Sequence, residues 1–145
     1  MKLHELFAIT LSLVQFPVVA NNINYQVDFG VIIQNDTGEP IGFEKTNKIP
    51  IITQGQTSLY GLVVTSPENE EFTLNSVHTL PQLEINTQEQ KIMGKPMLIQ
   101  KRGAILLRTD TDDAPGLYSI EVYIDNKLHN VIKYELVSHI QLANL

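Results

Sequence analysis

The stretch TDTDDAPGLYSIEVYIDNKLHNVIKYELV, residues 109–137, decides how the rest of this 145-residue chain is interpreted. Residues 117–124 alternate between apolar and polar types, and a period of two is typical of a half-buried β-strand. Residues 125–127 predict a tight turn, because Asp and Asn tolerate a left-handed backbone. The alternation resumes over 128–137, so the stretch predicts a β-hairpin. The apolar faces hold Tyr118, Ile120, Val122 and Ile124, then Ile132, Tyr134 and Leu136.

An acidic bend precedes this hairpin, running from Asp110 to Gly116, with Tyr118 two residues further on. The bend resembles the corner before the penultimate strand of immunoglobulin-like sandwiches, where a tyrosine bonds back to the backbone upstream. The antibody hallmarks are absent, since the chain has neither Cys nor Trp. The corner and hairpin that remain resemble the small cysteine-free immunoglobulin-like domains of exported bacterial proteins. The resemblance implies an all-β, antiparallel immunoglobulin-like β-sandwich of about seven or eight strands, with Gly116 and Tyr118 as structural corner residues. It implies no activity.

Other short apolar or alternating runs, bounded by Gly, Pro, Asn and Asp, support a sandwich. Ser58–Thr65 is apolar on both faces, which favours a central strand. The run around Pro50 suits an edge or a strand entry, because proline cannot donate a ladder hydrogen bond. Residues 101–103 predict a hairpin turn between the runs 92–101 and 104–109. The remaining predicted strands lie near residues 24–31, 43–47 and 72–77.

The first twenty residues predict a signal peptide. Lys2 provides a positive start, residues 6–16 form a short apolar run, and Val18-Val19-Ala20 offers small residues for cleavage. A buried first strand or helix of a cytosolic protein is the alternative. The apolar run is shorter than the roughly 20 residues of a membrane span. We therefore expect a signal peptide at 1–20, a sandwich domain at 21–138, a tail at 139–145, and a periplasmic or secreted location.

Composition narrows the classes of partner. The net charge of −6 disfavours nucleic acid, where cations that neutralise phosphates supply most of the affinity. With no Cys, no disulfide can stabilise the fold, so its stability must come from burial of apolar surface. The expected partner is a protein or a component of the cell envelope.

One carboxylate cluster is a weak candidate for a metal site. Asp110, Asp112 and Asp113 offer the oxygens that hard cations such as calcium prefer. Proline stands at position 115, where a helix-loop-helix calcium loop needs glycine, so the alternative is a polar corner whose carboxylates cap backbone amides. The chain shows no Gly-x-Ser-x-Gly motif and no glycine-rich phosphate loop. The sequence therefore predicts no enzyme, no catalytic residue and no cofactor.

Residues 91–102 are the strongest candidate for partner binding. Lys91, Lys95, Lys101 and Arg102 bring positive charge to an acidic chain, and Met93, Met97, Leu98 and Ile99 interleave with them. Methionine is common at adaptable binding surfaces, so the segment could dock an acidic partner or an anionic glycan. The alternative is an ordinary strand pair with the lysines in water and the apolar side chains in the core.

These features predict an exported, non-catalytic binding or envelope-associated domain. One alternative is a structural or stress-related envelope protein without a defined ligand. Another is a carbohydrate-binding or calcium-dependent adhesion module, for which Tyr25, Tyr60 and Tyr123 would be the aromatic candidates.

Overall fold

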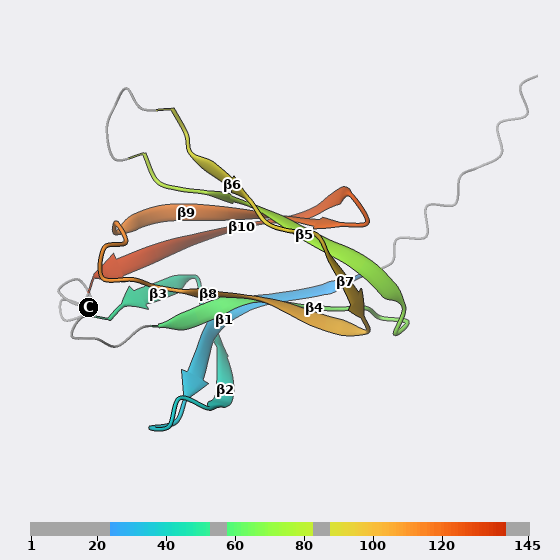
Figure 1. The fold of residues 1–145 in the computed structure, drawn as a ribbon, viewed down its shortest axis with the longest axis horizontal. Helices are drawn as coiled ribbons and strands as arrows, with labels where there is room; N and C mark the ends of the chain where they lie inside the picture. The colour runs from blue at the N-terminus through green and yellow to red at the C-terminus, as the bar shows by residue number, and fades with distance from the viewer. Residues whose placement is uncertain (1–23, 53–57, 83–87, 139–145) are drawn as a thin grey trace, which may run out of the picture.

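The computed structural model describes residues 24–52, 58–82 and 88–138, and within these ranges the regular structure consists of ten strands (Figure 1). The predicted leader 1–20 and tail 139–145 lie outside the described residues. Among those described, no helix has the length and hydropathy that crossing a membrane requires. The strands are β1 (Gln26–Gln34), β2 (Pro40–Lys45), β3 (Lys48–Ile51), β4 (Leu59–Thr65), β5 (Glu71–Thr79), β6 (Lys91–Met93), β7 (Met97–Gln100), β8 (Arg102–Arg108), β9 (Gly116–Ile124) and β10 (Lys127–Ser138).

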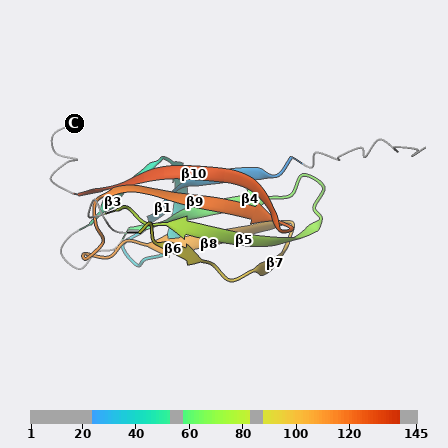
Figure 2. The same cartoon turned by 90° about the horizontal axis from the view of Figure 1, so that it is seen from above.

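The strands form two sheets that face each other, which confirms the predicted all-β sandwich (Figure 2). One sheet has the order β2-β1-β4-β8, and the other has the order β3-β10-β9-β5-β6, with β7 also paired to β5. The strand count exceeds the predicted seven or eight. The end of β1 continues with β2 as a hairpin that projects from the sandwich, and β2 is exposed along its whole length (Figure 1).

The core lies between the sheets and follows the predicted alternation. On β9, Ile120 and Val122 are fully buried and Ile124 is nearly so, while Leu117 on the opposite face is 72% exposed. The buried core contains Ile49, Ile51, Tyr60, Leu62, Val64, Phe72, Leu74, Ile120, Val122, Ile124, Tyr134 and Leu136. Burying these side chains supplies the apolar contacts on which a cysteine-free domain depends.

The predicted hairpin is present as β9 and β10. Asp125 and Asn126 both have left-handed backbones, with φ of 49° and 62°, and Lys127 pairs with Ile124 across the turn. Two consecutive positive φ angles match the right-handed twist of the strands that the turn joins. Here Asp and Asn adopt the conformation for which glycine is the commoner choice.

Pro50 and Ser58–Thr65 take the positions their sequences predict. β3, which contains Pro50, lies at the edge of the six-stranded sheet and pairs in parallel with β10. β4 lies between β1 and β8, and its Leu62 and Val64 are fully buried.

The predicted hairpin at residues 101–103 is wrong. β7 pairs with β5 in one sheet, whereas β8 pairs with β4 in the other, so the chain crosses between sheets at Lys101, where φ is 66°. Inward-facing side chains explain the crossing. The side chain of Ile99 packs directly over Gly103, and a Cβ at residue 103 would collide with it. The two segments therefore contribute to the core from opposite layers.

Candidate functional site

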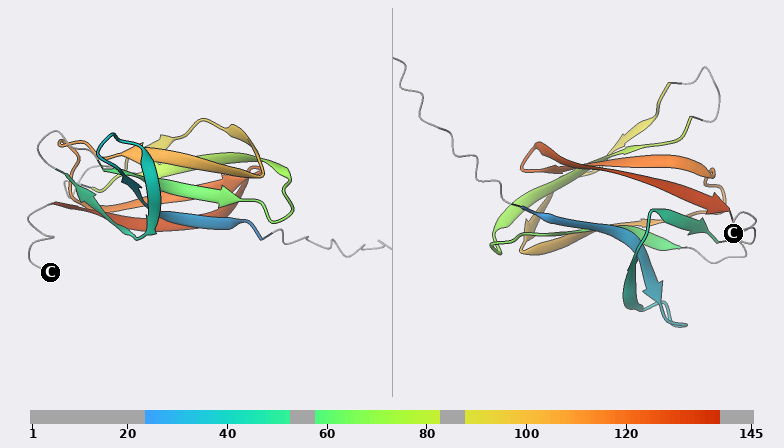
Figure 3. Two further views of the ribbon diagram at one scale, coloured as in Figure 1. Left: turned by 90° about the horizontal axis from the view of Figure 1, so that it is seen from below. Right: turned by 180° about the vertical axis from the view of Figure 1, so that it is seen from behind.

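Three strands form one long side of the sandwich, which we call the basic edge: β6, β7 and β8. β6 and β7 run one after the other along the margin of the six-stranded sheet, and β8 forms the margin of the four-stranded sheet (Figure 3). Among the described residues, no further strand pairs outside them. The basic edge thus presents two open strand margins side by side.

Charge is segregated onto this edge. Residues 91–108 contain five cations and no Asp or Glu, so they carry +5, and the rest of the chain carries −11 against a total of −6. The five side chains, all exposed, are Lys91, Lys95, Lys101, Arg102 and Arg108. A segment with charge of a single sign attracts partners of opposite charge and speeds their encounter, although Glu89 and Glu121 of neighbouring segments lie within 4 Å of Lys91 Nζ.

The predicted cations are spread along the edge. Lys91 pairs with Thr79 at one end of β5, and Gln100 pairs with Glu71 at the other. Those ends are eight residue steps apart, or roughly 26 Å at about 3.3 Å per step. Lys101 and Arg102 lie together at the far end. Arg108, which sequence reasoning missed because it lies beyond the Met-bearing segment, also belongs to the edge.

Lys91 is partly engaged by carboxylates. Its Nζ lies 3.5 Å from Glu121 Oε1 and 3.8 Å from Glu89 Oε2, with the lysine side chain 47% exposed. Exposed pairs of this kind add little to stability. In the described part of the chain, Lys95, Lys101 and Arg102 form no ion pair within 4 Å, although Arg102 interacts electrostatically with Asp28.

The apolar residues of the edge divide between the two expected roles. Met97 and Ile99 pack against the core, as the strand interpretation requires. Met93 and Leu98 are 73% and 68% exposed, and Ile92 and Leu106 are also exposed. Met97 and Ile99 thus follow the strand interpretation, while the exposed apolar side chains lie among the cations and leave partner binding a prediction.

A cavity of about 280 Å³ lies at the Arg108 end of the edge. Its lining includes Ile92 from β6 and Leu107 from β8, so it lies in the gap between the two sheets. Three tyrosines from deeper in the sandwich also line it: Tyr60, Tyr118 and Tyr134. Its mixture of apolar walls and a few polar groups is typical of a binding cavity.

The tyrosines form a neutral cluster. Tyr60 Oη and Tyr134 Oη are 3.4 Å apart, and the rings of Tyr118 and Tyr134 stack with centroids 5.5 Å apart. Burial raises the pKa of both Tyr60 and Tyr134, so their hydroxyls keep their protons at neutral pH. Only one of the two hydroxyls can donate to the other, and the second hydrogen is left for another acceptor.

His78, which also lines the cavity, forms a pair with Ser76 at 2.9 Å. Burial lowers the pKa of His78, so the ring is neutral at pH 7. Ser76 is only 2% exposed within β5, which leaves its hydroxyl inaccessible to a substrate. The pair is therefore best described as a satisfied internal hydrogen bond.

In the acidic bend, two carboxylates accept hydrogen bonds from backbone N–H groups. Asp113 Oδ2 accepts from the backbone N–H of Asp110 at 2.6 Å, and Asp110 Oδ1 accepts from that of Thr111 at 2.7 Å. Asp112 is exposed. Among the described residues, no three His, Cys, Asp or Glu side chains gather as metal ligands. These contacts match the capped polar corner. Within the same corner, Tyr118 Oη donates to the carbonyl of Ala114 at 2.8 Å.

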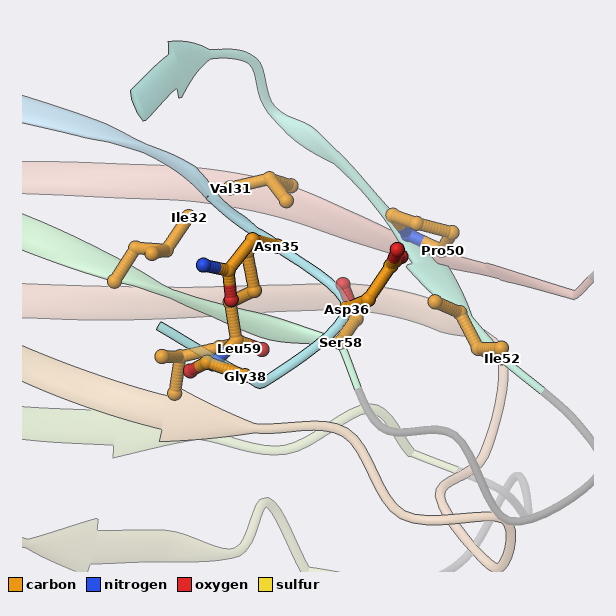
Figure 4. A pocket seen from close by; sticks show the side chains of 10 residues that line it. Val31, Ile32, Asn35, Asp36, Gly38, Pro50, Ile52, Ser58 and Leu59 are labelled. Atoms are coloured by element: carbon orange, nitrogen blue, oxygen red, sulfur yellow. The ribbon is translucent and has the colours of Figure 1, made fainter. Parts of the chain in front are cut away.

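Two other features are weaker candidates for a binding site. A larger hollow of about 580 Å³ lies beneath the β1–β2 turn (Figure 4). The Asn35 side chain there already accepts from Thr37 and from the backbone N–H of Glu39, so it serves the turn. The tyrosines considered for sugar stacking offer no exposed platform, because Tyr60 is buried and Tyr25 and Tyr123 are half-buried.

Comparisons with known proteins agree with the fold. No family model and no curated protein sequence matches the chain. An immunoglobulin-like protein from Pseudomonas aeruginosa matches in structure with a TM-score of 0.51 and 14% identity, covering 79% of this chain and 94% of that one. This chain is therefore an immunoglobulin-like β-sandwich by fold.

Weaker structural likenesses concern parts of larger enzymes. A β-glucosidase from Listeria innocua has a TM-score of 0.43 and 7% identity, and the match covers 79% of this chain but 16% of the enzyme. An alkylpurine DNA glycosylase from Pseudomonas fluorescens has a TM-score of 0.43 and 10% identity, covering 77% of this chain and 30% of the glycosylase.

Proposed function

We propose that this chain is an exported, non-catalytic binding domain that holds an acidic protein of the cell envelope at its basic edge. The observation that carries the proposal is the charge segregation: five exposed cations and no carboxylate over residues 91–108 of an otherwise acidic chain. The periplasmic or secreted location rests on the signal peptide expected at 1–20.

Two further observations support a protein partner. Exposed Ile92, Met93, Leu98 and Leu106 lie among the cations and provide apolar contact area. The basic edge also follows two strand margins, and strand margins are common docking sites for polypeptides. Charge on such a surface mainly sets encounter rate and specificity, while the apolar contacts add affinity.

Reversing charge on the edge tests the proposal. The triple variant Lys95→Glu, Lys101→Glu, Arg102→Glu should keep the thermal midpoint, since exposed substitutions usually change stability by about 0.5 kcal/mol or less. Lys91 is left intact because of its contact with Glu121. In affinity capture from envelope extracts, the wild-type domain should retain a partner that the triple variant loses. Raising the salt concentration should release that partner, because exposed charges are screened over about 8 Å at physiological ionic strength.

The matched control changes the same number of cations elsewhere. Lys48, Lys127 and Lys133 are exposed and lie outside the basic edge, so their reversal to Glu gives the same net charge. This control should capture the partner as the wild type does. Equal loss in both triple variants would show that only net charge matters, and undiminished capture by the edge variant would contradict the proposal.

A further inference from the structure

Among the described residues, no strand pairs with the outer margin of β8, and the positions of its outward backbone groups follow from the ladder. Ser66 N–H donates to Lys101 C=O at 2.8 Å, and Thr109 N–H donates to Ser58 C=O at 2.9 Å, which fixes both ends of the β4–β8 ladder. The register between those ends has no shift. In an antiparallel ladder every second residue faces the partner strand, so Ala104 and Leu106 direct their N–H and C=O groups away from β4.

The gap beside this margin is closed at one end and open at the other. Near Lys101, the side chain of Ile99 fills the space above Gly103. Near Arg108, the tyrosine-lined cavity occupies the gap, with Leu107 of β8 in its wall. Its volume of about 280 Å³ corresponds to about nine water molecules at roughly 30 Å³ each, enough for one large apolar side chain. A strand added beside β8 would direct alternate side chains into this gap.

The charges at the two ends of β8 determine which kind of strand can pair with its outer margin. Arg102 and Arg108 lie at the two ends of β8. A second copy pairing antiparallel about Ile105 would place Arg102 of one chain opposite Arg108 of the other, and like charges directly opposite destabilise a strand pair. A strand with carboxylates at both ends would instead meet an arginine at each end.

We propose that an extended, acid-flanked segment of a protein partner adds to β8 as a fifth strand of the four-stranded sheet. Its backbone pairs with Ala104 and Leu106, its terminal carboxylates contact Arg102 and Arg108, and one large apolar side chain enters the tyrosine-lined cavity. This inference rests on the proposed function, because it specifies how the acidic partner engages the basic edge.

The probe is a synthetic peptide of about nine residues, which spans the 7 residues of β8 and extends by about one residue at each end. It has two aspartates at each end and alternates valine and threonine between them, with phenylalanine as its third residue, the position opposite Leu107 when the peptide pairs antiparallel with β8. Amide hydrogen exchange followed by NMR on the full domain gives the decisive measurement. The peptide should slow exchange at Ala104 and Leu106, whose N–H groups point outward, and leave Ile105 and Leu107, which already face β4, unchanged.

Variants of both partners test the same contacts by calorimetry. Ala104→Pro removes one outward N–H at a position where an edge strand tolerates proline, and affinity should fall about tenfold or more. Ala104→Thr keeps that N–H and should bind within about twofold of the wild type. A peptide with glycine in place of the phenylalanine should bind about tenfold more weakly to the unaltered domain, a result independent of whether the proline variant folds.

The outcomes separate this inference from the proposed function. Binding that depends on Arg102 and Arg108 but leaves Ala104 and Leu106 unprotected would overturn strand addition and keep the acidic-partner proposal. If the peptide still slows exchange at Ala104 and Leu106 after both arginines are changed to Glu, the preference for a strand with acidic ends would be overturned. Absence of peptide binding would overturn the inference. Slower exchange at Ala104 and Leu106 as the protein concentration rises without peptide would also overturn it, in favour of self-association.

Discussion

Tyr118 connects the acidic bend to the core through both ends of its side chain. Its ring stacks on Tyr134, which is only 3% exposed, and its hydroxyl donates to Ala114 C=O, four residues upstream. Burial raises the pKa of Tyr118, so the donor is present across the physiological range of pH. One side chain therefore fixes the loop that follows β8 and leads into β9.

Removing this hydroxyl should weaken the corner. Tyr118→Phe keeps the ring stack and leaves Ala114 C=O without its donor, which should lower the free energy of unfolding by about 1–2 kcal/mol. Denaturant unfolding with an unchanged m-value measures this loss. Tyr123→Phe is the matched control, because its hydroxyl bonds the partly exposed Glu121 side chain and not a backbone carbonyl, so its midpoint should move less. Equal midpoints for both variants would show that the corner hydrogen bond contributes nothing.

Strand β7 shows how one short element serves two purposes. Its residues alternate between half-buried and exposed, with Ile99 packed against the core and Leu98 facing solvent. The interruption at Gly94–Pro96 ends β6 and lets β7 resume pairing with the other half of β5. Inward residues thus join the sheets, and outward residues form the surface of the basic edge.

Adjacent alanine substitutions on β7 should differ sharply in their effects. Ile99→Ala removes contacts to the core and to the space above Gly103, and should cost about 1–3 kcal/mol, less than a fully buried isoleucine would. Leu98→Ala removes an exposed side chain and should cost about 0.5 kcal/mol or less. Thermal unfolding of the two proteins, prepared side by side, gives the comparison. Similar losses from both would mean that Leu98 is packed rather than exposed.

At the scale of the whole molecule, sequence reasoning succeeded where local chemistry determines the structure. The period of two on β9 and β10, the Asp125-Asn126 turn and the edge position of Pro50 follow from backbone preferences and burial. It failed at Lys101, because a turn signal indicates reversal of the chain but not which sheet receives the next strand. The cavity could not be predicted either, since Tyr60, Leu107 and Tyr134 meet only through tertiary packing.

The order of segments along the chain leads to a final prediction about processing. Cleavage after Ala20 would leave five residues ahead of β1, which begins at Gln26, so every described strand would remain in the mature domain. Because the fold contains no Cys, that domain should unfold at the same temperature with or without a reducing agent. Mass spectrometry of the protein recovered from its native cells should find Asn21, or a residue within about two positions of it, at the N-terminus, since the small residues before it match a signal-peptidase site. Recovery of the chain from the cytosol with Met1 intact would contradict export and, with it, the envelope partner proposed for the basic edge.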